Sequence, residues 1–197
     1  MKRGAQRQLP FHGGPRPGSG RPRGNRTSHA ARPQFGKPTP VHVTLRMKPH
    51  VWNLRSRRSF RRLRSCFEQA RGRFGARLVE YSVQGNHLHR ILEAEDSVAL
   101  SRGMQGLAIR IAKALNALMG RNGRVFDDHY FARLLRTPTE LVRAIRYVLG
   151  NAAHHFRAAS TDSFSSAALP KEAPELAAPV GWLLRRGTRR LALVLRW

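Results

Sequence analysis

Two runs with the period of a β-strand, separated only by Gly85-Asn86, constrain this chain more than any other feature. The runs ARLVEYSVQ and HLHRILEA are β-like, with side chains set to alternate between the two faces of a sheet. Glycine and asparagine both tolerate positive φ, which a tight turn between two antiparallel strands often needs. The segment therefore predicts a β-hairpin.

Further strands and helices surround the hairpin. VHVTLRM at 41–47 alternates and predicts a strand, and VFDDHYFARLL at 125–135 predicts another. Between them two helices are expected from apolar residues at three- and four-residue spacing. The first carries Phe60, Leu63, Phe67 and Ala70 and ends at Gly72, and the second begins at Asp96 or Ser97 and ends at Gly120.

A third helix is predicted by Thr137-Pro138-Thr139-Glu140. Thr137 fits the N-cap, Pro138 the first helical position, and Glu140 the reciprocal partner in a capping box. This helix should run to about His155. The resulting order, β-α-β-β-α-β-α, predicts an α+β fold: a ferredoxin-like antiparallel four-stranded sheet with helices on one face, plus a further helix free to carry chemistry.

Composition divides the chain into four parts. Residues 1–39 contain many basic, Gly and Pro residues and no acid, which predicts a disordered basic arm. Residues 40–157 form the predicted folded domain, and 158–179 a linker rich in Ser, Ala, Pro and Glu. Residues 180–197 are a basic, apolar C-terminal extension, which we expect to form a short helix or strand pair against the domain. Its arginines, among them Arg185 and Arg186, are candidates for phosphate contacts.

The charge points to a polyanionic partner. The chain has 37 Lys and Arg against 11 Asp and Glu, a formal net charge of +26. Nucleic acid is the usual partner of such a protein, because each neutralised phosphate releases condensed counterions. A ribosome-associated protein, or a GC-rich genome that favours arginine codons, would also give an excess of arginine.

Two features narrow the class of protein. Cys66 is the single cysteine, so an intramolecular disulfide and a cysteine zinc cluster are excluded, and we expect this residue to be packed. The N-terminus has no apolar signal region, and no stretch is long enough to span a membrane. The expected location is the cytoplasm, in association with the nucleoid when the protein is bound to DNA.

Four residues together could support phosphodiester chemistry. His87 and His89 are two apart on a predicted strand, so their imidazoles share one face, while Tyr147 and Asn151 are four apart on the third helix and share another. Each has an ordinary explanation alone: polar strand residues, a packed aromatic, and a residue near the end of a helix. Together they provide a nucleophile and metal ligands, two requirements of phosphodiester transesterification.

The segments YSVQGNHLH and GRVFDDHYFARLLRTPTELVRAIRYVLGN resemble the HUH single-tyrosine transposases, in particular the REP-associated tyrosine transposase branch. The resemblance covers roughly residues 41–157. It implies a ferredoxin-like fold, a divalent metal (Mg²⁺ or Mn²⁺) held by His87, His89 and Asn151, and Tyr147 as the nucleophile that forms a 5′-phosphotyrosine.

The chain departs from the family pattern at two positions. Arg90 stands where the family usually has an apolar residue, and Ala152 follows Asn151 where a proline is usual. Without that proline the helix can continue, so that His154 or His155 could replace one ligand.

The resulting hypothesis is a metal-dependent endonuclease and strand transferase acting on single-stranded or hairpin-forming repeat DNA, as a monomer or homodimer. Tyr130 is a rival nucleophile, Asp127 and Asp128 are possible extra ligands, and Arg143 and Arg146 could hold the scissile strand. A non-catalytic hairpin-binding protein is the first alternative. A structural ribosome-associated protein is the second.

Overall fold

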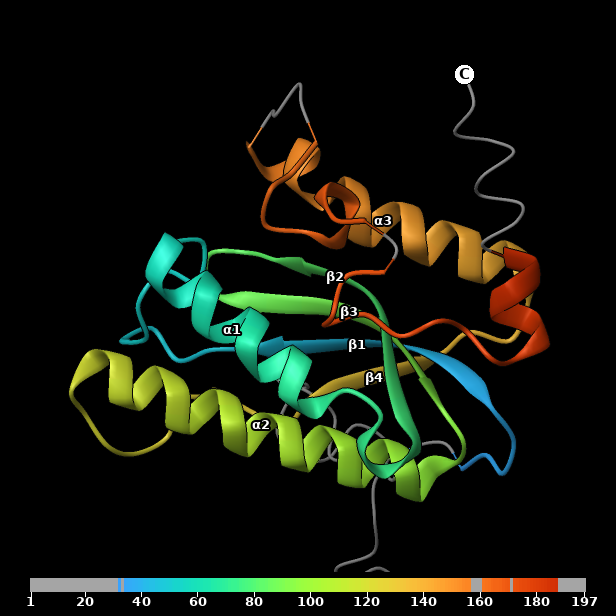
Figure 1. Cartoon of the computed structure of the whole chain (residues 1–197), viewed down its shortest axis with the longest axis horizontal. Coiled ribbons are helices and arrows are strands. Elements are labelled where there is room, and N and C mark those ends of the chain that lie inside the picture. The colour runs from blue at the N-terminus through green and yellow to red at the C-terminus, as the bar shows by residue number, and fades with distance from the viewer. Residues whose placement is uncertain (1–31, 33, 157–160, 171, 188–197) are drawn as a thin grey trace, which may run out of the picture.

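The computed structural model describes residues 32, 34–156, 161–170 and 172–187. Most of the predicted basic arm and the last ten residues lie outside this part of the chain. The described residues form one antiparallel four-stranded sheet in the order β2-β3-β1-β4, with helices on both faces (Figure 1). This is the strand order of a ferredoxin-like fold, so the predicted α+β class is confirmed.

The predicted hairpin consists of β2, Ala76–Val83, and β3, His87–Ala94. Neither Gly85 nor Asn86 adopts a positive φ, although the sequence suggested one. The turn is instead held from outside, because the Met47 amide donates to the Asn86 carbonyl (2.8 Å) and the Leu54 amide donates to the Gly85 carbonyl (2.9 Å). The hairpin is thus fixed by its neighbours as well as by its own turn residues.

The main core lies between the sheet and two helices, α1 (Arg57–Ala70) and α2 (Ser97–Met119). Alternation in β1, Thr39–Arg46, directs Val41, Val43 and Leu45 into this core. The α2 helix begins as predicted, since the Asp96 carboxylate accepts a hydrogen bond from the Ala99 amide (2.6 Å). It ends at Gly120, whose φ of 62° is left-handed and suits glycine.

The fourth strand is shorter than predicted. The sequence indicated a strand over 125–135, but β4 covers only Phe131–Leu134, with one isolated bridge between Met47 and Phe126. In the intervening turn the Asp128 carboxylate accepts a hydrogen bond from the His129 amide (2.7 Å). Short acidic side chains compete in this way with the strand ladder for backbone groups, and an alternating pattern does not reveal it.

The third helix, α3, spans Pro138–Phe156 and lies on the face of the sheet opposite α1 and α2 (Figure 1). Its predicted capping box is present: the Glu140 amide donates to Thr137 Oγ1 (3.2 Å) and the Thr137 amide donates to Glu140 Oε2 (3.3 Å). A stripe of apolar residues holds the helix against β2 and β3, and forms a second core with them: Val79, Ile91, Leu141, Ile145, Val148 and Leu184.

The segment predicted as a linker lies against the edge strand β2, within its described residues. The Val83 amide donates to the Phe164 carbonyl (2.9 Å), and the Ala177 amide donates to the Leu78 carbonyl (2.8 Å). A short 3-10 helix, η2 (Ser166–Ala168), lies between these contacts. The linker composition did not predict this arrangement, which covers backbone groups that an edge strand would otherwise expose.

Two buried acids anchor the same segment. Asp162 forms a bidentate ion pair with Arg55, with hydrogen bonds of 2.8 and 3.0 Å. Glu175 forms an ion pair with Arg64 on α1. Residues 182–187 then form a helical turn whose Leu184 is buried against α3. This part of the predicted C-terminal extension is helical and packs against the domain, whereas residues 188–197 lie outside the described part. No described helix is long and apolar enough to cross a membrane.

Candidate functional site

Polar residues gather on the sheet face that carries α3. Because side chains alternate along a strand, His42 and Thr44 of β1 point to the face opposite the main core. His87 and His89 of β3 point to the same face, and Thr44 lies directly across from His89 in the β1–β3 register. The sheet thus presents three imidazoles and a hydroxyl on two neighbouring central strands.

The His89 ring is oriented by two neighbours. His89 Nδ1 lies 3.2 Å from His42 Nε2 and 3.2 Å from Thr44 Oγ1. The His42 pKa is lowered to about 4, mainly by burial and further by the charge of Arg133, so His42 is neutral near pH 7. A neutral His42 can accept at Nε2 a hydrogen bond donated by a protonated Nδ1 of His89, and His89 would then hold an ion through its Nε2.

His87 has a comparable arrangement at the start of β3. Its Nδ1 lies 2.8 Å from Asn86 Oδ1, and its ring meets the His89 ring edge-on with 4.8 Å between centroids. Metal-binding histidines commonly direct one nitrogen at such a protein partner and the other at the ion.

Tyr147 is brought to the imidazoles by α3. Its ring centroid lies 5.3 Å from that of His89 and 5.9 Å from that of His42, with nearly perpendicular planes in the first pair. The side chain is 46% exposed. The helix contacts β2 and β3, while Phe131 on β4 is exposed, so the described residues leave an open approach to Tyr147 from the β1–β4 side of the sheet.

Asn151, one helical turn after Tyr147, has an uncompensated polar group. Its side chain is only 1% exposed, and within the part of the chain that the structure describes neither its Oδ1 nor its Nδ2 has a hydrogen-bond partner. Leaving a buried amide unsatisfied costs about 1–3 kcal/mol, so such groups are uncommon unless a ligand or water satisfies them. The described part of the chain contains no group of three His, Cys, Asp or Glu residues placed to hold a metal ion. A metal site beside His87 and His89 would therefore need the amide oxygen of Asn151 as a ligand.

The residues present fit a divalent ion. Two imidazoles and one amide oxygen form a mixed nitrogen and oxygen set, which suits a transition ion such as Mn²⁺ better than Mg²⁺, whose preferred ligands are oxygens. The unsatisfied Asn151 amide is the structural observation that supports this fit. His154 and His155, predicted as substitute ligands, lie on α3, but their side chains are outside the described part.

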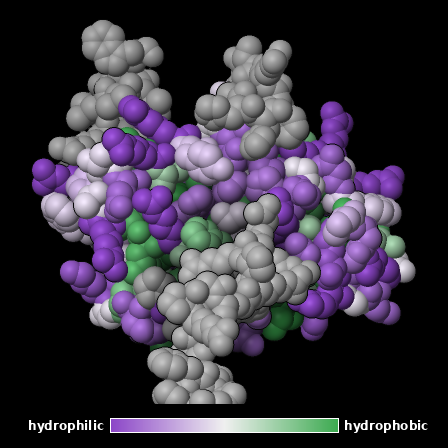
Figure 2. Space-filling model, turned by 180° about the vertical axis from the view of Figure 1, so that it is seen from behind, coloured by the Kyte–Doolittle hydropathy of each residue, from purple (hydrophilic) through white to green (hydrophobic). Residues whose placement is uncertain are grey.

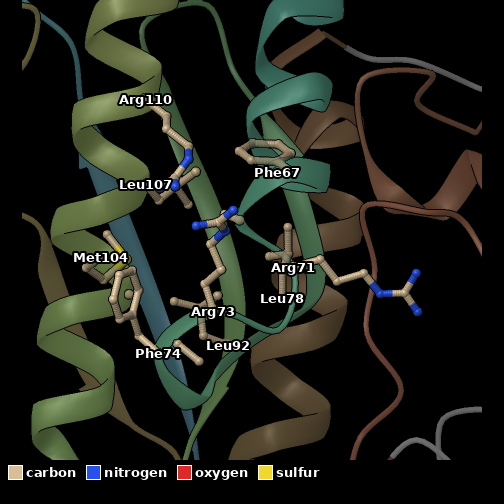
Figure 3. A pocket seen from close by; sticks show the side chains of 12 residues that line it. Phe67, Arg71, Arg73, Phe74, Leu78, Leu92, Met104, Leu107 and Arg110 are labelled. Atoms are coloured by element: carbon tan, nitrogen blue, oxygen red, sulfur yellow. The ribbon is translucent and has the colours of Figure 1, made fainter.

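Other predicted residues do not join the cluster. Tyr130 packs against the main core on the opposite face, and Asp127 and Asp128 lie in the turn before β4. The small enclosed pocket in Figure 3, of about 30 Å³, also lies on that opposite side, between α1 and α2. Apolar side chains from these helices line it, together with Arg71, Arg73 and Arg110, so it provides neither a nucleophile nor a set of metal ligands.

The four basic candidates lie at the surface on two different elements. Arg143 and Arg146 are exposed on α3, close in sequence to Tyr147. Arg185 and Arg186 are exposed on the helical turn 182–187, where Arg185 Nε donates to the Pro179 carbonyl (3.3 Å) and Arg186 lies over the Trp182 ring. Hydrophilic residues also predominate on the face seen in Figure 2.

Two site residues were missed from the sequence. His42 could have been found, because the alternation of VHVTLRM places it on the polar face of the strand together with Thr44. Gln84 is buried and donates through Nε2 to Ser82 Oγ (2.7 Å), while its Oε1 has no partner among residues 32, 34–156, 161–170 and 172–187. Its burial depends on packing, for which the sequence gives no signal.

Comparison with solved structures identifies the fold. A REP-associated tyrosine transposase bound to a REP hairpin matches with a TM-score of 0.59 and 15% identity, over 79% of this chain and 94% of that one. A candidate transposase from Deinococcus radiodurans R1 matches with a TM-score of 0.42 and 13% identity, over 58% and 88%. No protein-family model and no curated protein matches the sequence.

Proposed function

We propose that this chain, which shares its fold with a REP-associated tyrosine transposase, is a member of that branch of HUH enzymes and cuts and rejoins single-stranded DNA. The observation that carries the proposal is the placement of Tyr147 edge-on to His89, one helical turn from a buried amide that has no partner among the described residues. A merely structural tyrosine would not require unsatisfied polar groups beside it.

His87, His89 and Asn151 would hold the divalent ion. When bound, such an ion withdraws electron density from the non-bridging oxygens of the scissile phosphate and neutralises charge in the transition state. Residues of the chain would orient the metal ligand, supply the nucleophile and contact the DNA. His42 and Thr44 orient His89, α3 positions the phenol, and Arg143 and Arg146 lie where a DNA backbone could pass.

In the proposed reaction the Tyr147 hydroxyl oxygen attacks the phosphorus atom. A bond forms between that oxygen and phosphorus, while the bond to the 3′ oxygen of the preceding nucleotide breaks. The phenol proton is transferred, through solvent or a neighbouring base, to the departing oxygen, which leaves as a free 3′-hydroxyl. The 5′-phosphotyrosine retains the phosphodiester bond energy, so a 3′-hydroxyl can reverse the reaction and rejoin DNA without ATP.

We infer a hairpin-forming single strand as the substrate. The solved relative in fold is bound to a REP hairpin, and the net charge of +26 favours a nucleic-acid backbone. A single strand suits the site because a strand that is not paired can lie across the open sheet face next to Tyr147. We expect the protein to work in the cytoplasm, where it would meet chromosomal DNA.

The test is covalent trapping. A hairpin-forming single strand labelled at its 3′ end is incubated with the protein and Mn²⁺, and the products are separated on a denaturing protein gel. We expect a labelled protein adduct that EDTA abolishes, that is lost in Tyr147→Phe, and that remains in the matched control Tyr130→Phe. An adduct that survives in Tyr147→Phe would refute the assignment. Tight hairpin binding with no adduct in any condition would indicate a binding protein without catalysis.

A further inference from the structure

The first two turns of α1 carry four exposed arginines, Arg57, Arg58, Arg61 and Arg62, which we call the arginine face. Two pairs within it are four residues apart, a spacing at which like charges destabilise a helix. Positive charge near a helix N-terminus also opposes the helix dipole, and the first turn of α1 contains no acid. This arrangement disfavours the isolated helix.

The described chain does not compensate these charges. Its ion pairs involve Arg55, Arg64, Arg77 and Arg133, and none involves a residue of the arginine face. Codon bias would explain arginine in place of lysine, but not four uncompensated cations in the first turns of one helix. An external polyanion would explain them.

A groove runs beside the arginine face, between α1 and residues 163–175, with a volume of about 740 Å³. Arg57 and Arg61 line it, together with the rings of Phe60 and Phe164, whose centroids are 4.9 Å apart. Two acids also line it: Glu175, whose charge is compensated by Arg64, and the exposed Glu68, so that the cations of the groove still outnumber its acids. Cations beside aromatic side chains suit a single nucleic-acid strand, which offers phosphates and apolar base faces.

The groove begins close to the candidate active site. The Leu54 amide, just before α1, donates to the Gly85 carbonyl in the β2–β3 turn, and that turn leads directly into His87. Figure 1 shows the N-terminal end of α1 beside this end of the hairpin. A strand that leaves the imidazoles near His87 can therefore cross the turn and reach Arg57 in the first turn of α1.

From these observations we propose that the arginine face and its groove bind the backbone of the DNA that flanks the cleavage site. The binding would be independent of base sequence, because arginine contacts to phosphate carry no sequence information. The proposal rests on the proposed function for the identity of the strand, but its binding step needs neither metal nor an active tyrosine.

The test compares two double variants in a Tyr147→Phe background without metal. Arg57→Gln/Arg61→Gln removes two charges from the groove, and Arg102→Gln/Lys113→Gln removes two exposed charges from α2 as a matched control. Fluorescence anisotropy measures binding of a short strand, which covers only the active site, and of a strand extended by about ten nucleotides. We expect the groove variant to weaken binding of the extended strand severalfold. Its log–log salt slope should decrease by about 1.4, at about 0.7 per lost phosphate contact.

The control and the short strand separate the possible failures. The affinity of the control variant for the extended strand should change by less than about twofold, and so should the affinity of both variants for the short strand. An equal loss in both double variants would show a general effect of net charge, and no loss in the groove variant would show that the groove does not bind DNA. Either result would overturn the proposal. Failure of the proposed catalysis would instead appear in the covalent-trapping experiment, as a missing adduct in the unsubstituted protein with Mn²⁺, while the binding of both strands stays normal.

Discussion

The Tyr147 ring meets the His89 ring edge-on, with 5.3 Å between their centroids and 83° between their planes. The contact joins the last helix of the domain to a central strand, across the sheet face opposite the main core. The contact depends on two features. A stripe of apolar residues packs α3 against β2 and β3, and the alternation of side chains along β3 directs His89 to this face. The phenol remains about half exposed, so a strand of DNA can reach it.

His42 should control how well His89 binds metal. In His42→Phe the nitrogen that lies 3.2 Å from His89 Nδ1 is lost, and we expect Mn²⁺ affinity to fall by roughly 10–100-fold, as is typical when the partner of a ligating histidine is removed. Electron paramagnetic resonance titration of Mn²⁺ measures the affinity directly. The control His50→Phe changes an exposed histidine that lies 3.2 Å from the Arg124 carbonyl and should leave it unchanged. Equal affinity in both variants would contradict the role of His42.

Asn151→Leu should make the metal-free protein more stable while abolishing cleavage. Its amide is buried, and no described residue pairs with it, so leucine removes an uncompensated polar group and should raise the free energy of unfolding by about 1–3 kcal/mol. Urea denaturation in EDTA measures this change. In the control Asn116→Leu stability should fall, because that side chain donates to the Gly123 carbonyl (2.9 Å). A destabilised Asn151→Leu would mean that the amide already has a partner in the metal-free protein.

Arg90→Met should also stabilise the fold. Arg90 points into the main core with 0% exposure, and none of its three guanidinium nitrogens has a hydrogen-bond partner in the described structure. Burial lowers its pKa to about 10, so it remains charged at neutral pH. Replacing buried charge with an apolar side chain of similar volume commonly gains about 1–4 kcal/mol, which thermal and urea unfolding would detect. Loss of stability would instead show that an anion outside the described residues neutralises Arg90.

Glu175→Gln should weaken the attachment of residues 161–187 and change the response to acid. Burial would raise the Glu175 pKa, but hydrogen bonds from Arg64 and from the Tyr81 hydroxyl outweigh burial and lower it below 4.5. The carboxylate therefore stabilises the fold fully above the unfolded-state pKa of about 4.5, and this contribution is lost as the pH falls through the lower, folded-state value.

At pH 7 the loss in Glu175→Gln should be about 1.5–3 kcal/mol, the range for hydrogen bonds to charged groups. As the pH falls through the folded-state pKa the variant and the parent should converge, as measured by urea unfolding across the pH range. The exposed Glu172→Gln in the same segment is the control and should leave the free energy of unfolding at pH 7 unchanged. A constant difference down to pH 2 would show that the side-chain volume, rather than its charge, matters.

Local sequence determined the elements of this protein. The Thr137 and Glu140 capping box, the left-handed Gly120 and the alternation of the hairpin each depend on residues a few positions apart, and the structure has all three. The strand predicted at 125–135 is present but shorter, at 131–134, because a side chain of the preceding turn competes for the backbone. The sequence also did not show that the linker residues would lie along β2, because that depends on pairs such as Arg55 and Asp162, which are 107 residues apart.

The sequence also determined which chemical groups the protein has, but only the tertiary structure decided which of them meet. The spacing of His87 and His89 placed them on one face of a strand, and the spacing of Tyr147 and Asn151 placed them on one face of a helix. The side of the sheet on which that helix lies, and therefore whether Tyr147 or Tyr130 approaches the imidazoles, depends on how apolar surfaces pack over long separations in the chain. The arrival of His42 at His89 likewise follows from strand register, which pairs Thr44 with His89 and so brings His42, 47 positions from His89, diagonally next to it.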